Sequence, residues 1–498
     1  MELMYSSTRN DKVKLTASQA ILKGLADDGG LFVPERIPAL DVPMDTLADM
    51  SYQETAYEVM SRFFTDFTED ELKDCIKKAY DSKFDTPEIA PLVDADGAYY
   101  LELFHGPTIA FKDMALQLLP YLMTVSAKKT ADGKTIVILV ATSGDTGKAA
   151  LEGFKDVDHT KIVVFYPVDG VSPMQKHQMN TQEGENVRVC AIKGNFDDAQ
   201  TGVKKIFTTP SVAEKLAENN MLFSSANSIN WGRLLPQIVY YISAYCDLVN
   251  DGKIELGDKI NVVVPTGNFG NILASYYASL MGLPINKFIC ASNSNNVLTD
   301  FIKTGVYDKN RNFYTTISPS MDILVSSNLE RLLYKLSGDN DEVTRGWMNA
   351  LKSEGKYEVS DDVKAVINEK FYGGFCDDKN TEATIHEMFE QDKYLCDTHT
   401  AVAINVYKQY VEETGDKTPS VIASTASPYK FSKAVLEAVE PNATLPETEF
   451  DMVDELHKVS GAEVPAPLAN LKNKTARFSD VTEVSDMENY VLGALGID

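Results

Sequence analysis

Cysteine and histidine are scarce in this chain of 498 residues, which contains six of each. The cysteines are scattered, with no CxxC pair and no histidine-rich segment beside them. This pattern supports neither a disulfide framework nor a zinc site, and no metal is expected. Because reduced, unpaired cysteines are typical of the cytoplasm, we expect the protein to be cytoplasmic.

Long apolar runs are also lacking. The first twenty residues, MELMYSSTRNDKVKLTASQA, contain no apolar stretch of the kind that a signal peptide needs. No apolar run approaches the ~18 residues that cross a bilayer. The sequence therefore predicts neither secretion by that route nor insertion into a membrane.

Basic residues are few relative to acidic ones. The chain has 47 Lys and Arg against 73 Asp and Glu, a formal net charge of −26. Such a charge repels nucleic-acid phosphates and anionic lipids, so neither is an expected partner. An anionic small molecule would need a site where helix N-termini and a few basic side chains concentrate positive potential.

The length predicts two to four compact units at ~100–200 residues each. Residues 46–80 have the pattern of two helices, the second opened by the capping pair Thr68 and Glu71. From residue 98 onward, short apolar runs such as TIVILVA (135–141), KIVVFYP (161–167) and INVVVP (260–265) alternate with amphipathic stretches. This alternation is typical of a doubly wound α/β fold, whose strands are covered on both faces.

Three glycine-rich turns follow apolar runs and open predicted helices. The clearest is PTGNFGN at 265–271. Glycines allow close approach of the backbone, and successive N–H groups at a helix start favour a phosphate. A tight strand-to-helix turn without a ligand explains the same residues equally well.

The second turn, ATSGDTGK at 141–148, superficially resembles a nucleotide P-loop. A P-loop has four residues between its first glycine and the Gly-Lys pair, whereas only Asp145 and Thr146 separate Gly144 from Gly147. Ala149 also stands where a magnesium-binding Ser or Thr is needed. The spacing therefore argues against an NTPase.

The third turn, HGPTIAFKD at 105–113, places Lys112 at a predicted helix start. The helix dipole disfavours an ammonium group there and favours the neutral amine, which is the form that attacks a carbonyl. A solvated surface lysine is the more common explanation of a single lysine in such a place.

Taken together, these motifs resemble one enzyme family. MYSSTR, DDGGLFVP, HGPTIAFKD, ATSGDTGKAA, SANSINWGR, PTGNFGN and ASTASPYKF are similar in order and spacing to threonine synthase in its longer form. That family consists of pyridoxal-phosphate enzymes of the tryptophan-synthase-β type, or fold type II. The resemblance implies two doubly wound open sheets with flanking helices and a mostly helical N-terminal domain.

The resemblance also implies a domain organisation. An N-terminal domain would cover 1–95, and a large cofactor-binding domain would cover 96–134 and 232–498, with a helical insertion at about 300–395. A small mobile domain would cover 135–231. A monomer or weak homodimer is expected.

Site residues follow from matching the motifs position by position. Lys112 resembles the lysine that holds pyridoxal phosphate as a Schiff base and serves as catalytic base and acid. Thr425 resembles the partner of the pyridine nitrogen. Gly267, Asn268, Phe269, Gly270 and Asn271 resemble the loop around the cofactor phosphate. Ser143, Asp145 and Thr146 would lie against the cofactor ring and the substrate carboxylate, with the role of Asp145 left open because an ionised carboxylate cannot donate a hydrogen bond.

Asn227 and Arg233 resemble the pair that binds the substrate phosphate, although an isolated arginine more often pairs with a carboxylate. The implied reaction converts O-phospho-L-homoserine and water to L-threonine and phosphate. A related dehydratase or phospholyase would keep Lys112 and the glycine loop. A non-catalytic cofactor-binding relative would keep the loop but lack Asn227 or Arg233, and both are present.

Overall fold

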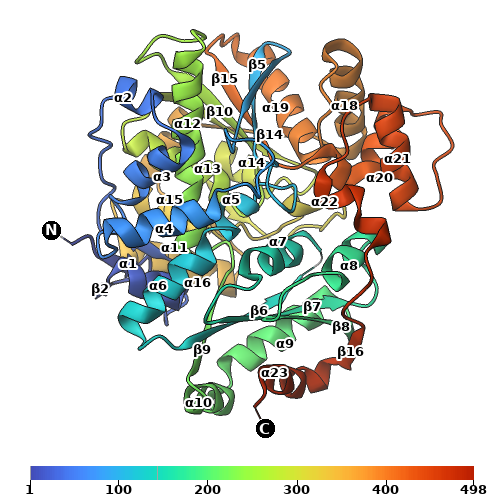
Figure 1. Cartoon of the computed structure of the whole chain (residues 1–498). Helices are drawn as coiled ribbons and strands as arrows, with labels where there is room; N and C mark the ends of the chain where they lie inside the picture. The colour runs from blue at the N-terminus through green and yellow to red at the C-terminus, as the bar shows by residue number, and fades with distance from the viewer. Residues whose placement is uncertain (1, 143, 498) are drawn as a thin grey trace.

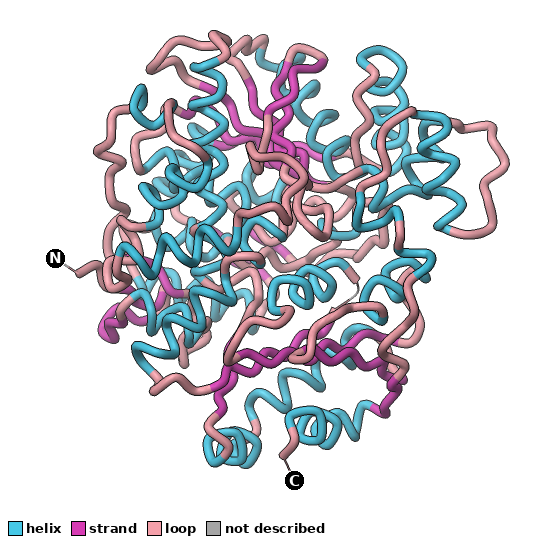
Figure 2. The backbone as a smooth tube through the Cα atoms, in the orientation of Figure 1, coloured by secondary structure: helices cyan, strands magenta, loops and turns pink. Residues whose placement is uncertain are grey.

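Two separate β-sheets organise the computed structural model, which describes residues 2–142 and 144–497. Figure 1 shows the smaller sheet at the bottom of the molecule and the larger one above it, with α7 lying between them. The tube in Figure 2 shows helices on both sides of the lower sheet. The predicted doubly wound α/β architecture is confirmed.

The larger sheet has six strands in the order β14-β11-β10-β15-β5-β4. All neighbours are parallel except β4 and β5. The strands are β4 (Leu92–Ala95), β5 (Ala98–Glu102), β10 (Ile260–Pro265), β11 (Ile285–Ser292), β14 (Phe371–Phe375) and β15 (Ser420–Ser424). Every residue of β10 and β15 is buried, as continuous apolar runs in a parallel sheet require.

Helix α19 contacts four strands of this sheet, namely β10, β11, β14 and β15. The α-helices of this part of the chain are α5 (Asp113–Leu116), α11 (Trp231–Leu234), α12 (Pro236–Asn250), α13 (Gly270–Leu280), α14 (Val297–Thr304), α15 (Leu329–Leu336), α16 (Asp341–Ser353), α17 (Asp361–Lys370), α18 (Asp378–Asp392), α19 (Thr398–Thr414), α20 (Ser432–Val439), α21 (Glu449–Ser460) and α22 (Ala466–Ala469). Single 3₁₀ turns are η1 (Pro319–Met321), η2 (Pro428–Phe431) and η3 (Leu471–Asn473).

The smaller sheet has five parallel strands in the order β16-β8-β7-β6-β9. They are β6 (Thr135–Ala141), β7 (Thr160–Pro167), β8 (Val187–Lys193), β9 (Met221–Ser224) and β16 (Asp480–Glu483). The remaining helices around it are α6 (Leu119–Thr130), α7 (Asp145–Phe154), α8 (Pro173–Asn180), α9 (Phe196–Thr208), α10 (Pro210–Glu218), η4 (Val484–Asp486) and α23 (Met487–Leu495).

The C-terminal segment departs from the expected boundary, which put all of 232–498 with the larger sheet. Strand β16 instead pairs in parallel with β8 in the smaller sheet. Met487 and Val491 of α23 join the apolar cluster formed by Val137 and Val163. Burial of this helix face against the smaller sheet draws the end of the chain back to it, and Figure 1 shows α23 beneath that sheet near the C-terminus.

The segment 300–395 is not only helical. Besides α14 to α18, it contains an antiparallel pair, β12 (Val306–Asp308) with β13 (Lys356–Glu358), and the edge strand β14. The sequence of β14, FYGGF, has two glycines and therefore a weak strand signal. Glycine suits this close approach, because a Cβ on Gly373 would lie 3.1 Å from the Thr299 Cα of α14, a tight contact.

The N-terminal region adds a small sheet to the expected helices. Strands β1 (Tyr5–Ser7), β2 (Asn10–Leu15) and β3 (Phe32–Pro34) form an antiparallel sheet beside α1 (Ala17–Lys23), α2 (Met44–Ala48), α3 (Tyr52–Met60) and α4 (Glu69–Ala79). The predicted capping pair Thr68 and Glu71 opens α4. No helix in the described part of the chain is long and apolar enough to cross a membrane, and all six cysteines are buried free thiols.

Candidate functional site

Lys112 lies at the N-cap of the one-turn helix α5 and is half-buried. The pKa of Lys112 is lowered to about 8, chiefly by burial and also by the charges of Lys430 and Arg233, against the opposing effect of Asp145. Within residues 2–142 and 144–497 no hydrogen bond holds the amine. Desolvation and neighbouring cations thus shift the pKa in the direction that a nucleophilic amine requires, and the nucleophilic role of Lys112 stays a prediction.

Thr425 is held beside Lys112 by backbone hydrogen bonds. The Phe111 N–H donates to the Thr425 carbonyl at 2.8 Å, and the Ser427 N–H donates to the Ile109 carbonyl at 3.0 Å. Thr425 is buried, and its hydroxyl makes no hydrogen bond to the described residues. Lys112 and Thr425 therefore lie close together, and the Thr425 hydroxyl is available to a ligand.

The loop 265–271 leads from β10 into α13, as predicted. Gly267 has no room for a side chain, since a Cβ there would lie 2.7 Å from the Ser320 carbonyl oxygen. Phe269 has a φ of 66°, in the left-handed region that a non-glycine residue rarely adopts. The Ser326 hydroxyl donates to the Gly267 carbonyl at 2.6 Å. The loop is thus held in one defined shape at the start of an eleven-residue helix.

Asn271, in the first turn of α13, has an amide nitrogen that is buried without a hydrogen-bond partner among the described residues. Its Oδ1 accepts a hydrogen bond from the Tyr241 hydroxyl. This bond fixes the orientation of the amide, with Nδ2 on the side away from the Tyr241 hydroxyl. A buried donor left unpaired is costly, so it indicates an acceptor supplied by a ligand.

The turn after β6 is also tightly built. The Thr142 hydroxyl accepts hydrogen bonds from the N–H groups of Gly144 at 3.0 Å and Gly147 at 2.9 Å. Thr146 is half-buried in the first turn of α7, while Ser143 lies outside the described residues. Lys148 forms an ion pair with Glu152 at 2.9 Å, so it is not directed at a nucleotide phosphate as a P-loop lysine would be.

Asp145 is an ionised acceptor in this structure. The Gln175 Nε2 donates to its Oδ1 at 2.9 Å, and the Lys430 Nζ lies 3.4 Å from the same oxygen. Burial alone would raise the pKa of Asp145, but Lys430 and Lys112 bring it below the ordinary value. Its place is thus that of a counter-ion between two lysines.

Lys430 was not predicted as a site residue. It is only 6% exposed, and its Nζ donates to the Thr108 carbonyl at 2.8 Å. Lys430 therefore connects two parts of the molecule: the loop that contains Lys112, and Asp145 in α7 beside the smaller sheet. The available signal was its place within ASTASPYKF, directly after a buried strand.

Arg233 is 5% exposed, and its Nη1 donates to the Ala226 carbonyl at 2.7 Å. Its Nε has no partner, and no carboxylate of the described chain lies within ion-pair distance. Burial lowers the pKa of Arg233 to about 10. The alternative of an arginine paired with a carboxylate is contradicted, and a buried guanidinium without a counter-ion indicates an anionic ligand.

Asn227 precedes α11 and is exposed, and its side chain makes no hydrogen bond to the described residues. Asn328, from the segment where no motif was predicted, connects this region to the glycine loop. Its Nδ2 donates to the Ser228 carbonyl at 3.2 Å, and its N–H donates to the Asn268 carbonyl at 3.0 Å. The structure therefore brings SANSINWGR and PTGNFGN together.

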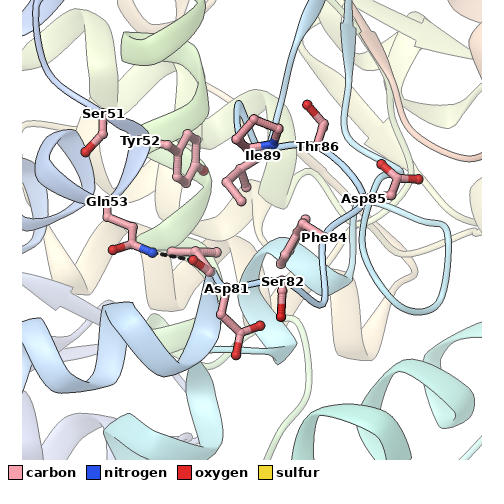
Figure 3. A pocket seen from close by; sticks show the side chains of 11 residues that line it. Ser51, Tyr52, Gln53, Asp81, Ser82, Phe84, Asp85, Thr86 and Ile89 are labelled. Carbon is pink, nitrogen blue, oxygen red and sulfur yellow. Dashed lines mark hydrogen bonds between the residues drawn. The ribbon is translucent and has the colours of Figure 1, made fainter.

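A cleft of about 420 Å³ lies elsewhere, between residues 51–53 at the start of α3 and the segment 80–89. Figure 3 shows Tyr52, Phe84 and Ile89 around it. None of the predicted site residues lines this cleft, so it is separate from the candidate site.

Three family models match the chain. "Threonine synthase N terminus" matches residues 4–80, "Pyridoxal-phosphate dependent enzyme" matches 85–425, and "Threonine synthase, C-terminal" matches 400–491. The second alone covers more than half of the sequence.

Known proteins agree with these matches. The chain is 42% identical to threonine synthase-like 1 of Homo sapiens over 85% of its own length, although it spans only 58% of that protein. It is 36% identical to the threonine synthase of Saccharomyces cerevisiae, over 92% of this chain and 93% of that one. A crystal structure of PLP-bound threonine synthase from Brucella melitensis superposes with a TM-score of 0.87 at 36% identity, covering 99% of each chain. With the sequence motifs, the sheet topology and these matches in agreement, the chain belongs to the threonine synthase family of pyridoxal-phosphate-dependent enzymes.

Proposed function

We propose that this protein is a threonine synthase, which converts O-phospho-L-homoserine and water to L-threonine and phosphate. The observation that carries the proposal is that Lys112, a half-buried lysine of lowered pKa, lies near Arg233, a buried arginine with no counter-ion among the described residues. The first suits chemistry at a carbonyl, and the second suits a phosphorylated substrate.

The residues present fit pyridoxal phosphate. The half-buried Lys112 amine of lowered pKa suits its aldehyde, and the rigid turn 267–271 at the start of α13 suits its phosphate. The free hydroxyl of Thr425 suits its ring nitrogen, and the unpaired amide of Asn271 offers a further donor. When bound, the cofactor supplies an electron sink for negative charge that develops on the substrate carbons.

Arg233 supports recognition of the substrate phosphate. Its Nη1 is held by the Ala226 carbonyl while its Nε stays free, so one edge of the guanidinium can meet an oxyanion. On a chain of net charge −26, a buried cation without a carboxylate partner is the kind of site that attracts a dianion. Asn227, six positions earlier, would add a neutral donor at the exposed side.

Lys112 would move the protons of the reaction. Its amine would take the proton from Cα and release it before taking one from Cβ, which allows phosphate to leave from Cγ. The ammonium would then give a proton to Cγ, the freed amine would accept the proton that water loses on adding to Cβ, and a proton would finally return to Cα. A group with a pKa of about 8 can both accept and donate protons near neutral pH. Lys430 and Arg233 favour the accepting form and Asp145 favours the ammonium form, so the three charges tune one base.

Asp145 and Lys430 would hold the two sheets in register around the substrate. Asp145 belongs to α7 of the five-stranded unit, and Lys430 follows β15 of the six-stranded unit. We assign Thr146, next to Asp145, to the substrate carboxylate side, together with Ser143. Cytoplasmic location and a monomeric or weakly dimeric state stay predictions.

The proposal is tested by supplying O-phospho-L-homoserine to the pyridoxal-phosphate-loaded protein and identifying the products. Threonine and phosphate are expected in equal amounts. A related phospholyase or dehydratase would release a 2-oxo acid and ammonia. Borohydride reduction followed by peptide mapping should place the pyridoxyl label on Lys112, whereas a label on Lys148 would overturn that assignment.

A further inference from the structure

A polar segment at the start of α19 lies between two parts of the proposed cofactor site. Asp397 is fully buried and caps the helix, accepting hydrogen bonds from the N–H groups of His399 at 2.9 Å and Thr400 at 3.2 Å. Because α19 leads back across the sheet into β15, which is parallel to β10, its first turn lies at the carboxyl ends of those strands.

One arm of this segment leads to the glycine loop. His399 Nδ1 lies 2.8 Å from the Asp397 Oδ2, and the Ser320 N–H donates to His399 Nε2 at 3.1 Å. Since the amide nitrogen can only donate, Nε2 is the acceptor, and we assign the ring proton to Nδ1, facing Asp397. Ser320 in turn packs against Gly267, where a Cβ would lie 2.7 Å from its carbonyl oxygen.

The other arm leads to Thr425. The Thr400 hydroxyl donates to the Asp397 Oδ1 and accepts from the Thr425 N–H at 3.3 Å. Thr425 is in turn bonded through its carbonyl to the Phe111 N–H, beside Lys112. The two oxygens of the Asp397 carboxylate thus begin two separate chains of contacts. One chain leads to the glycine loop and the other to Thr425, at opposite ends of the proposed cofactor site.

We propose that Asp397 is a positioning residue that fixes the separation between the cofactor's phosphate loop and Thr425, acting on the loop through His399 and Ser320 and on Thr425 through Thr400. This inference rests on the proposed function, in which 267–271 binds the cofactor phosphate. A buried, fully hydrogen-bonded network of this kind resists small displacements, which is what precise placement of a ligand requires.

Two substitutions of His399 separate its contacts. His399→Gln keeps an acceptor near the position of Nε2, so the bond to Ser320 can persist. His399→Asn keeps a donor near Nδ1 but cannot reach Ser320. We expect His399→Asn to weaken binding of pyridoxal phosphate to the apoprotein by about 3- to 10-fold, the effect of one net hydrogen bond, and His399→Gln to weaken it less.

Pyridoxal, which lacks the phosphate, provides the specific readout. Its affinity for the apoprotein should be unchanged by either substitution, because the His399 arm ends at the phosphate loop. His386→Asn is a matched control, since the only hydrogen bond of this α18 histidine to the described residues is with the Ala438 carbonyl, at 3.0 Å. Thr400→Val should shift the absorbance of the bound cofactor without changing the ratio of the two affinities.

The affinities are measured by absorbance titration of the full-length apoprotein, with thermal unfolding of each variant as the folding control. If the wild-type protein binds pyridoxal and pyridoxal phosphate equally, the assignment of 267–271 fails, and with it the proposed site. If the wild type discriminates and His399→Asn keeps the same ratio, the positioning proposal is overturned while the site stands. An equal loss of both affinities in His399→Asn and His399→Gln would also overturn it, because the role would then be general stability.

Discussion

The titration of Lys112 is the most direct electrostatic consequence of the structure. Its pKa is lowered from 10.5 to about 8. At pH 8 about half of the Lys112 amines should then be neutral, against roughly 0.3% for a lysine at the ordinary value. Competitive acylation of the apoprotein over a range of pH, followed by mass spectrometry of the peptide that contains Lys112, measures this fraction. Lys73, an exposed lysine whose pKa is raised by Glu69, is the internal control.

Two substitutions should move this titration in opposite directions. Lys430→Met removes a cation that disfavours the ammonium form, so the pKa of Lys112 should rise. Asp145→Asn removes the favourable anion, so the pKa of Lys112 should fall. A general loss of packing would open the site to water and raise the pKa in both variants. The reasoning is refuted if Lys112 in the wild-type protein titrates with Lys73, or if both variants shift it in the same direction.

Three further substitutions test other parts of the site. Arg233→Ala should reduce kcat/KM for O-phospho-L-homoserine by about 30-fold or more, since a desolvated charge-assisted contact is worth roughly 2–5 kcal/mol; steady-state kinetics measure this, with the exposed Arg36→Ala as control, and unchanged kinetics would reject the role. Gly147→Ala places a Cβ 2.4 Å from the Thr142 Cγ2 and should lower the free energy of unfolding by about 1–3 kcal/mol, measured by chemical denaturation. Gly493→Ala on α23 is the control: no atom lies within 4 Å of the added Cβ, so the substitution should be neutral or stabilising. Thr425→Asp adds a negative charge beside the proposed ring nitrogen and should produce a long-wavelength absorbance band with slower threonine formation; a wild-type spectrum and rate would show that Thr425 does not contact that nitrogen.

The parts of the fold that follow from local pattern were predictable. The apolar run of β10 and the glycines after it signal a buried strand and a turn at a ligand-binding edge. The turn 144–147 was separated from a P-loop by its spacing and by Ala149, and the ion pair of Lys148 with Glu152 agrees with that exclusion. Lys112 was predicted at a helix start, although most of its lowered pKa comes from burial, which no short motif reveals.

The parts that depend on distant contacts were not predictable. Three of the four residues of β16 are exposed and two are charged, so the segment becomes a strand only because β8 offers an unpaired edge. Lys430 and Asn328 gain their roles from partners that lie far away in sequence. Asp397 is an ordinary helix cap when viewed locally, and only the three-dimensional structure shows that its two oxygens serve two separate arms.

The measurement that tests the central claim most directly is a product balance on the purified protein loaded with pyridoxal phosphate and supplied with O-phospho-L-homoserine. If Lys112 transfers the protons and Arg233 holds the substrate phosphate, threonine and inorganic phosphate should appear in equal amounts, and Lys112→Ala should abolish both while the protein stays folded. Release of phosphate with a 2-oxo acid in place of threonine would contradict the account, as would threonine formation that persists in Lys112→Ala.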